Sequence, residues 1–405
     1  MSILFVSTHQ VTCGIADYNS DMMKAAGKHY DYDIEPLPQN GGAKKADLSR
    51  IADRARAYDC VVIQHEWSFF GGTHYEHYEY LRYFLKRLRK NNVPTAMIMH
   101  TRFTELRAIR LTSPHGIEDF RLKLARRLLI REINRSPLLR IFVHSKKFSE
   151  HLAKHTIRTD KFESLPFPLQ VYPERTPKPA KESGDTVTLL MFGFLSAYKG
   201  YEAALNALRL LPDNFRLVFA GGQHPSNPHD ITFENILAFL HQGVWLHHRQ
   251  IPPVGEVFTP EEHRAFETRV ELTGHLPTAE ITKAIDKADI VLAPYLLGGS
   301  PAGSAAVAWP ISLGKPTIVS SAHTFDDYIE ANCVIAVTPG ASYHLARAIK
   351  ALASDPDEMQ RLSAAALAFA RQNSVEATSL KILNKMQALR PRSVVKKEIS
   401  QPATP

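Results

Sequence analysis

The sequence predicts an α/β protein with two doubly wound domains. Short, apolar, β-branched runs alternate with helical stretches along nearly the whole chain, which is typical of parallel sheets covered by helices. A charged, proline-containing segment at residues 171–185 divides this alternation into two series. The length of 405 residues also exceeds what one ordinary core accommodates, so two domains are expected on that ground as well.

Four strands are predicted in the first domain, which spans residues 1–170. They are short and aliphatic, and helical stretches separate them, as expected for consecutive strand–helix–strand units. Helices are predicted near residues 17–28 and 48–59. The predicted strands are Ile3–Thr8, Cys60–Glu66, Pro94–Thr101 and Arg140–Ser145.

Six strands are predicted in the second domain, which spans residues 186–374. Its helices are expected at residues 201–211 and from about residues 341 and 357. Residues 223–269 contain several prolines and histidines and show no pattern that assigns them to an element. The predicted strands are Thr186–Gly193, Phe215–Gly222, Val270–Gly274, Asp289–Tyr295, Pro316–Ser321 and Cys333–Val337.

Three further segments complete the expected organisation. Residues 171–185 hold three prolines and many charges without a hydrophobic period, which indicates an inter-domain linker. Residues 375–389 have a helical pattern, and the basic residues 390–405 after them are expected to be disordered. Two Rossmann-like domains joined in this way predict a central cleft, faced by the ligand-binding ends of both sheets.

Composition indicates a soluble globular protein. Apolar residues make up 44% and charged residues 22% of the chain, and no apolar run approaches the roughly 18 residues that span a bilayer. The first residues show neither a basic region nor the cleavage pattern of a signal peptide. Three widely spaced cysteines fit a reducing compartment and do not suggest a disulfide framework or a zinc site. A cytoplasmic protein is therefore expected.

The net charge of +8 is concentrated in two places. Residues 102–147 contain twelve Lys and Arg against four Asp and Glu, and the chain from residue 381 onwards contains six against one. Basic surface can contact nucleic acid, anionic lipid or a phosphorylated substrate. No recognised nucleic-acid-binding motif accompanies the charge, so a nucleic-acid partner is not expected.

Several chemically capable residues lie at the carboxyl ends of predicted strands or just after them, where open α/β sheets bind ligands. Their position makes them the candidates for a functional site. They are Gly14, His65, Glu66, His100, Lys199 and Gly303.

Nine stretches, in this order, resemble the GT-B-fold retaining glycosyltransferases usually grouped as family 4. None of them is decisive alone, but together they cover most of the chain. They are CGIADY (Cys13–Tyr18), VVIQHEWSFFGG (Val61–Gly72), MHT (Met99–Thr101), VHS (Val143–Ser145), FGFLSAYKG (Phe192–Gly200), AGGQHP (Ala220–Pro225), LTGHLP (Leu272–Pro277), ADIVLAPY (Ala288–Tyr295) and SPAGSAAVAWPISLGKP (Ser300–Pro316).

The resemblance implies a division of labour between the domains. The N-terminal domain would bind the acceptor, and the C-terminal domain would bind a nucleotide-diphosphate sugar as co-substrate. Such enzymes usually need no metal ion or other cofactor, and their last helix, here residues 375–389, crosses back to the first domain.

Lys199 is the first candidate for catalysis. A departing nucleoside diphosphate carries about two negative charges, and a lysine between a strand end and a helix start suits them. The alternative is a surface lysine before a glycine turn. The family often carries an arginine just after the glycine of the preceding strand, where this sequence has Phe194. Another group such as Tyr198 would then have to help, unless its ring is packed.

Gly14 and His100 match two further positions of the family. The glycine would let the first loop approach the diphosphate, although a tight strand-to-helix turn would also explain it. The histidine would face the donor sugar as a second catalytic group. Its alternative is a buried imidazole whose nitrogens are satisfied by backbone groups.

The loop opening at Ser300 resembles a diphosphate cradle. Backbone N–H groups of Gly303, Ser304 and Ala305 would bind the phosphates, and Ser300 or Ser304 would add hydroxyl groups. By the same resemblance, Gly274 and His275 in LTGHLP would contact the donor base or ribose.

The same loop departs from the family in its acidic residues. Many members carry two glutamates eight positions apart here, and the second usually holds the ribose. The corresponding positions in this sequence are Pro301 and Trp309. Retention remains feasible because, in a front-face mechanism, the leaving phosphate itself accepts the acceptor proton.

His65 and Glu66 are the candidates for binding the acceptor. Glu66 is the best-placed carboxylate of the first half for an acceptor hydroxyl, and an ion pair with a nearby Lys or Arg is the alternative. His74 and His77 in HYEHYEY have a spacing that metal sites use, but no further ligands are evident. No metal site is therefore predicted.

The basic segment at residues 121–135 is amphipathic at helical spacing. Its apolar side contains Phe120, Leu124, Leu128 and Leu129, and arginines occupy the other side. One interpretation is contact with an anionic membrane surface or a lipid-linked acceptor. The other is an ordinary surface helix whose apolar face packs on the sheet.

The sequence thus predicts a cytoplasmic glycosyltransferase, with peripheral membrane contact as an option. It would move a sugar, with retention, from a UDP- or GDP-sugar to a glycan, glycolipid or small-molecule acceptor. A nucleotide-sugar epimerase on the same fold and a non-catalytic sugar-nucleotide-binding protein are the alternatives.

Overall fold

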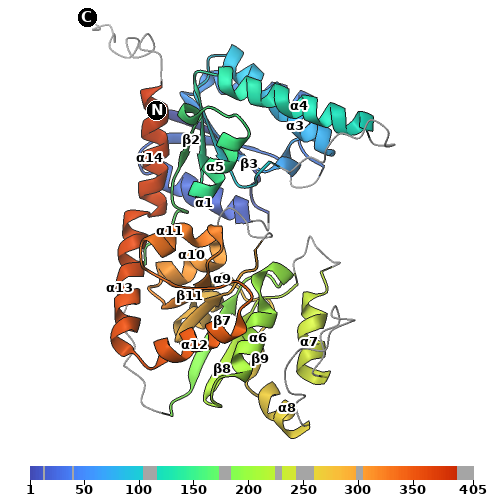
Figure 1. Cartoon of the computed structure of the whole chain (residues 1–405). Helices are drawn as coiled ribbons and strands as arrows, with labels where there is room; N and C mark the ends of the chain where they lie inside the picture. The colour runs from blue at the N-terminus through green and yellow to red at the C-terminus, as the bar shows by residue number, and fades with distance from the viewer. Residues whose placement is uncertain are drawn as a thin grey trace, which may run out of the picture. The chain divides into compact units, whose positions relative to one another are not determined.

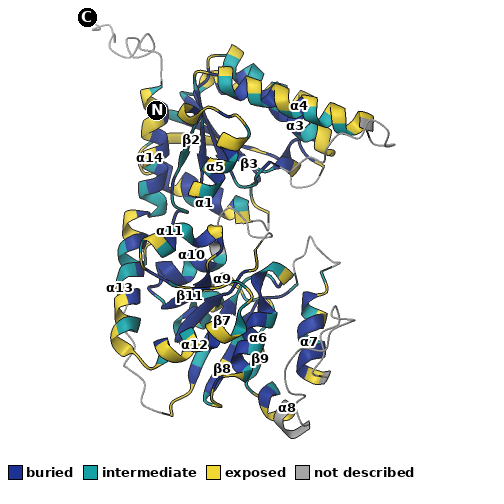
Figure 2. Ribbon diagram, viewed as in Figure 1, coloured by how far each residue is buried: buried dark blue, intermediate teal, exposed yellow. Residues whose placement is uncertain are grey.

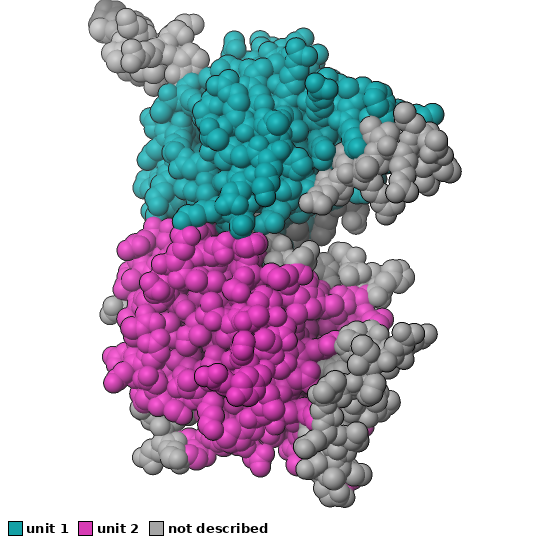
Figure 3. Space-filling model, viewed as in Figure 1, with its two compact units in different colours: residues 1–166, 375–405 teal, residues 167–374 magenta. Residues whose placement is uncertain are grey.

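The computed structural model describes residues 1–11, 14–38, 41–103, 116–172, 184–223, 230–242, 260–297 and 304–389. Contacts divide the chain into two compact units, coloured separately in Figure 3. Unit 1 consists of Met1–Pro166 with Val375–Pro405, and unit 2 consists of Phe167–Ser374. Most of the expected linker, residues 173–183, lies outside the described residues.

Unit 1 contains a parallel sheet of six strands in its described residues, in the order β2-β1-β3-β4-β5-β6. The central strands are buried on both faces, as the sequence predicts from their unbroken apolar runs. The strands are β1 (Ser2–Ser7), β2 (Asp31–Pro36), β3 (Cys60–His65), β4 (Thr95–Met99), β5 (Leu139–Val143) and β6 (Phe162–Ser164).

Unit 2 contains a second parallel sheet, again of six strands among the described residues, in the order β12-β11-β10-β7-β8-β9. All six were predicted from the sequence, and the strand order is that of a Rossmann-like doubly wound domain. The strands are β7 (Val187–Phe192), β8 (Phe215–Ala220), β9 (Val270–Leu272), β10 (Ile290–Ala293), β11 (Thr317–Ser320) and β12 (Ile335–Val337).

Two strands of unit 1, β2 and β6, have no counterpart in the predicted elements. Both lie at the edges of the sheet, where one side of the strand has no neighbour. In β2 only Glu35 is buried, and β6 has three residues, all half-buried. Without a buried apolar face, neither strand carries the pattern from which strands are recognised.

Helices cover the sheets in both units (Figures 1 and 2). Unit 1 has α1 (Gly14–Ala26), α2 (Lys45–Arg54), α3 (His74–Lys90), α4 (Gly116–Arg135), α5 (Lys146–Lys154) and α14 (Val375–Ala388). Unit 2 has α6 (Tyr201–Arg209), α7 (Thr232–Gln242), α8 (Pro260–Glu267), α9 (Thr278–Lys287), α10 (Ala305–Ser312), α11 (Asp326–Glu330), α12 (Ser342–Ala353) and α13 (Pro356–Gln372).

The C-terminal helix α14 packs with the first unit although it follows the second in the chain. It lies beside α1, and Lys28 after α1 makes a 2.6 Å ion pair with Glu376 in its first turn. The polypeptide therefore leaves unit 1 after Pro166 and returns to it at Val375. None of the helices in the described ranges is long and apolar enough to span a bilayer.

The strand order reverses at one point in each sheet. In unit 1 this switch point lies between β1 and β3, and in unit 2 it lies between β7 and β10. Connections leave such a pair of strands toward opposite faces of the sheet, which opens a crevice at their carboxyl ends. The loops after these four strands are therefore where each unit is expected to bind ligands.

Candidate functional site

In unit 2, Lys199 follows β7 at the switch point. The chain turns at Gly193, with φ +101°, and a short 3-10 helix, Ala197–Lys199, ends at Gly200, with φ +75°. A side chain at Gly200 would be only 2.1 Å from the carbonyl oxygen of Pro294, so the turn requires glycine. This turn directs Lys199 back over the end of its own strand.

The ammonium group of Lys199 is buried without a carboxylate. The residue is 6% exposed, and its Nζ donates a hydrogen bond to the carbonyl oxygen of Phe192, at 3.5 Å. Throughout the described ranges no Asp or Glu pairs with it. Burial lowers the pKa of Lys199 to about 8, so the group is still mainly protonated at neutral pH.

The first turn of α10 converges with Lys199 on the same glycine. A Cβ built on Gly193 would lie 2.6 Å from Nζ of Lys199 and 3.3 Å from Cβ of Ala306. Ser304, at the N-cap position, makes no side-chain capping bond and instead hydrogen-bonds the hydroxyl of Tyr295 at 2.9 Å. The positive end of the helix dipole and an ammonium group thus meet at the carboxyl end of β7, an arrangement suited to an anion.

The loop after β10 is described only in part. Ser300 and Gly303, the other predicted phosphate-binding residues of this loop, lie outside the described residues. Ser304 is buried, and Ala305 is the first residue of α10. The structure therefore brings Lys199 together with the beginning of α10 at the switch point of unit 2.

An aromatic pair lies next to the carboxyl end of β7. The ring of Phe194, at the position where the family often has arginine, is 5.1 Å from the ring of His275, edge to face. The His275 ring would be 2.7 Å from a side chain on Gly222, so glycine is needed for this approach. Gly274 has φ +67°, and its turn presents His275 at the surface.

Trp309 and Tyr198 are packed side chains. The Trp309 ring is half-buried and lies 5.9 Å from the ring of Phe192, in an apolar cluster. Trp309, where the resemblance implies a ribose-binding glutamate, therefore makes an apolar contact. The Tyr198 ring packs edge to face on Tyr295 at 5.3 Å, and burial raises its pKa.

In unit 1, a chain of hydrogen bonds leads to His100 at the end of β4. Gln64 and Asn19 are both fully buried, and the Gln64 side-chain amide donates to Asn19 Oδ1 at 3.2 Å. The other end of the same amide, Oε1 of Gln64, lies 2.9 Å from Nε2 of His100. The carbonyl oxygen of an amide can only accept, so Nε2 of His100 carries the proton and Nδ1 is left as an acceptor.

Two more side chains surround His100. Tyr18 of α1 has its ring 5.1 Å from that of His100 and 5.4 Å from that of His144, which follows β5. The Nδ1 atom of His144 lies 3.2 Å from the carbonyl oxygen of Leu165, so its Nε2 is the unprotonated nitrogen. Burial lowers the pKa of both histidines, that of His144 to about 4, and both imidazoles are neutral at physiological pH.

Glu66 and His65 differ in their surroundings. Glu66 is half-buried and accepts from the backbone N–H of Trp67 at 3.0 Å, and burial raises its pKa against the effect of hydrogen bonds that include Thr101. His65 is fully buried, with its ring 4.3 Å from that of Trp67 and 5.7 Å from that of Phe70. Of the two, only Glu66 has surface with which to contact an acceptor directly.

Gly14 is the first residue of α1, which follows β1 at the switch point of unit 1. A side chain added there would meet no atom of the described residues within 4 Å. Crowding by this part of the chain therefore does not explain the glycine.

Other clusters in the described residues do not form metal sites. No group of three or more His, Cys, Asp or Glu side chains lies close enough to hold an ion, within the ranges that the structure describes. His74 and His77 have their rings 5.5 Å apart, edge to face, on the first turn of α3. Among the residues that the structure describes, no third potential ligand is grouped with this pair.

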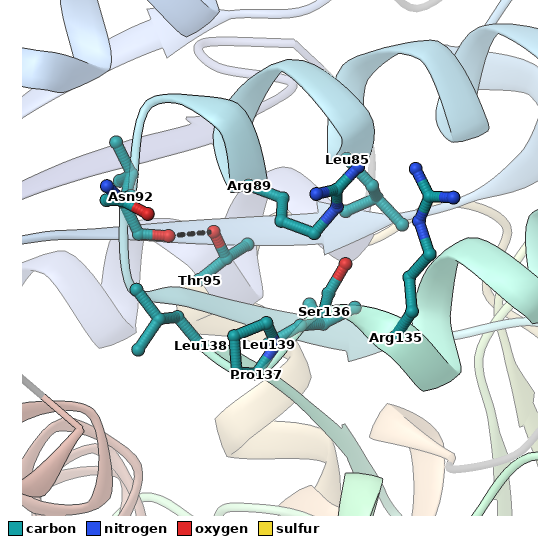
Figure 4. Close-up of a pocket in the computed structure, with 10 residues that line it drawn as sticks. Leu85, Arg89, Asn92, Thr95, Arg135, Ser136, Pro137, Leu138 and Leu139 are labelled. Carbon is teal, nitrogen blue, oxygen red and sulfur yellow. Dashed lines mark hydrogen bonds between the residues drawn. The ribbon is translucent and has the colours of Figure 1, made fainter.

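A cavity of about 160 Å³ lies at the amino ends of β4 and β5 in the unit 1 sheet, opposite the strand ends that hold the candidate residues (Figure 4). Arg89 of α3 and Arg135 of α4 line it. Both pair with the buried carboxylate of Glu132, at 2.6 and 2.9 Å, so much of their charge is already neutralised. The predicted site residues at the strand ends do not line this cavity.

The sequence did not single out Gln64, Asn19, Tyr18 or His144. Tyr18, Gln64 and His144 nevertheless lie inside stretches that carry the family resemblance, CGIADY, VVIQHEWSFFGG and VHS. Their positions at or near strand ends were the available signal. The hydrogen bonds between them are set by the packing of α1 against the sheet, which the sequence does not reveal.

Comparison with known proteins identifies the fold. No protein-family model matches the sequence, and no curated protein sequence matches it. The structure is similar to that of Anabaena HepE in complex with UDP, with a TM-score of 0.66 and 15% identity over 96% of this chain and 100% of that one.

Two further structures are similar over the whole chain. Sucrose-phosphate synthase from Thermosynechococcus elongatus has a TM-score of 0.65 and 14% identity, over 96% of this chain and 98% of that one. Trehalose-6-phosphate synthase from Burkholderia multivorans has a TM-score of 0.64 and 12% identity, over 99% of each chain. At such identities the likeness establishes the fold alone, and this chain has the GT-B fold.

The first prediction concerns the tautomer of His100. Ring-nitrogen chemical shifts measured by NMR should show the proton on Nε2 in the wild-type protein. Replacement Gln64→Leu removes the acceptor and should shift protons toward Nδ1 of His100. His144 is the internal control, because its tautomer depends on Leu165 and should not change. A wild-type His100 protonated on Nδ1 would contradict the hydrogen-bond chain.

The second prediction concerns the cost of burying Lys199. Lys199→Met should increase the free energy of unfolding by about 1–3 kcal/mol at pH 7, since a lowered pKa corresponds to roughly 1.4 kcal/mol per pH unit. The gain should shrink as the pH rises from about 8 past the ordinary lysine value of 10.5, where the wild-type side chain is neutral in both states. Urea unfolding at several pH values measures it, and a destabilised variant at pH 7 would refute it.

Proposed function

We propose that the protein is a retaining glycosyltransferase of the family 4 type, which takes a sugar from a nucleoside-diphosphate sugar. The observation that carries this proposal is the buried ammonium group of Lys199, which has no carboxylate beside it among the described residues and lies next to the start of α10. A buried cation is favourable when a ligand supplies the counter-charge. A diphosphate at the switch point of unit 2 would supply it.

The similar structures favour UDP as the nucleotide. HepE is described in complex with UDP, with UDP and glucose, and with UDP-glucose. In this chain, Phe194 and His275 form an aromatic pair close to the proposed phosphate site, and rings of this kind can stack on a base. A UDP-sugar is therefore the donor to test first, with a GDP-sugar as the alternative.

In the proposed mechanism, charge stabilisation comes from the protein and not from a metal ion. Lys199 and the backbone N–H groups at the start of α10 would stabilise the diphosphate as the bond to the sugar breaks. The leaving phosphate would accept the proton of the acceptor hydroxyl on the same face, which gives retention without a protein nucleophile. Correct positioning is then the main requirement.

Unit 1 would contact the sugar and the acceptor. Nδ1 of the neutral His100 can accept a hydrogen bond from a sugar hydroxyl. Glu66, whose pKa is raised by burial, can orient an acceptor hydroxyl. The acceptor would be a glycan, a glycolipid or a small molecule, and the buried, reduced side chain of Cys333 supports a cytoplasmic setting.

A non-catalytic nucleotide-sugar-binding protein is the second candidate. The observation that favours it is the apolar packing of Trp309 where the family usually has a carboxylate. Both candidates bind the donor through Lys199, so transfer must be measured separately. Release of UDP that depends on an added acceptor identifies the transferase, whereas binding without turnover identifies the second candidate.

The third prediction tests the donor site by calorimetry with UDP and UDP-glucose. Lys199→Met should weaken binding by about 10- to 100-fold, because a charge-assisted hydrogen bond contributes about 1.5–3 kcal/mol. Wild-type affinity should also fall as the pH rises above about 8, where Lys199 loses its proton.

The matched control for this experiment is Lys161→Met. Lys161 is also buried, but its Nζ donates to the carbonyl oxygen of Ser136 at 2.6 Å, in unit 1. This variant should bind UDP with the wild-type affinity. Equal affinity of the Lys199 variant and the wild type would exclude the proposed site.

A further inference from the structure

The helix α4 presents two apolar faces and not the single one that the sequence indicated. Its inner face is fully packed, with Ala125, Leu129 and Ile133 buried to 3% exposure or less. Phe120, Leu124 and Leu128 were expected on the same side as Leu129, but the structure leaves all three exposed. The helix has enough apolar positions for a packed face and for a second face that points outward. The spacing of these four residues along the sequence was not enough to assign them to the two faces.

The outward face forms a continuous stripe, which we call the α4 stripe: Ile117, Phe120, Leu124 and Leu128. Their exposed fractions are 78%, 53%, 44% and 37%. Spacings of three and four residues place them on one line of the helix, over about 17 Å. Figure 2 shows exposed residues along α4, which lies beside α3. A row of large exposed apolar side chains usually marks an interaction surface.

Positive charge borders the α4 stripe. Arg121, Arg127 and Arg131 are exposed on the same side of the helix. Arg121 lies over the ring of Tyr75 at 5.0 Å, and Arg127 and Arg131 form no ion pair with any residue of the described ranges. The one acidic side chain in the last two turns, Glu132, is buried and already paired with Arg89 and Arg135.

We propose that the α4 stripe lies in the surface of an anionic membrane, parallel to the bilayer. Apolar side chains would enter the boundary between headgroups and acyl chains, while the flanking arginines contact anionic headgroups. A second copy of this chain is a poorer partner, because stripe-to-stripe contact would bring the arginines of one copy against those of the other. Charge complementarity therefore selects an anionic lipid surface.

What the membrane contact implies for the acceptor rests on the proposed function. Unit 1 carries both α4 and the residues proposed to contact the acceptor. A membrane contact on this unit favours an acceptor that is itself anchored in the membrane, such as a lipid-linked sugar. Membrane binding is measured without any transfer reaction, so its failure would leave the donor site and its test untouched.

The fourth prediction is measured by flotation of the full-length protein with vesicles. Binding should be strong with phosphatidylglycerol in phosphatidylcholine vesicles and weak with phosphatidylcholine alone. Phe120→Ser combined with Leu124→Ser should reduce binding at least about 10-fold. Arg127→Gln combined with Arg131→Gln should reduce vesicle binding by roughly fivefold for each charge removed. The reduction should be smaller at high salt, which screens the charges.

Matched controls come from exposed residues of unit 2. Leu210 and Ile231 are 56% and 50% exposed, so Leu210→Ser with Ile231→Ser removes similar apolar surface elsewhere and should not change flotation. Insertion is tested separately with Phe120→Trp, whose fluorescence should be quenched by brominated lipids beyond the wild-type level. Equal flotation of all variants or an absence of quenching would overturn the proposal. So would a wild-type protein that is a dimer and becomes a monomer when Phe120 and Leu124 are replaced by serine.

Discussion

The buried ammonium group of Lys199 is the constraint on which the rest of the proposed donor site depends. It is held over Gly193 by a turn that needs glycine at position 200, and no carboxylate among the described residues neutralises it. Burial alone lowers its pKa to about 8. A fold optimised only for stability would place an apolar side chain there. The charge and the adjoining helix terminus are explained together if an anionic ligand completes the site.

Topology explains why the chemically capable residues gather where they do. Each sheet reverses its strand order once, and the loops after the two strands at that point hold the candidates. In unit 2 these are Lys199 and the start of α10. In unit 1 they are Gly14 and Glu66, with His100 one strand further on. Parallel sheets bring residues that are far apart in sequence to a common edge, so the chemistry follows from strand order more than from any local motif.

The sequence predicted the fold class, most strands and the candidates at the strand ends, because buried parallel strands leave an unmistakable apolar run. It missed β2 and β6, which lie at sheet edges and bury almost nothing. It assigned Leu129 and Leu128 to one face of α4, although Leu129 is buried and Leu128 is exposed. The chain from Asn19 through Gln64 to His100 was also beyond reach, because it joins α1, β3 and β4 through packing that no spacing along the sequence encodes.

Titration of Lys199 with and without UDP tests the central claim most directly. Lysine side chains labelled with isotope can be followed by NMR, and Lys199 is assigned by comparison with Lys199→Met. Lys199 should have a pKa of about 8 in the free protein, and this pKa should rise to the ordinary lysine range or above when UDP binds, because the diphosphate favours the charged form. A Lys199 pKa that saturating UDP leaves unchanged would contradict it.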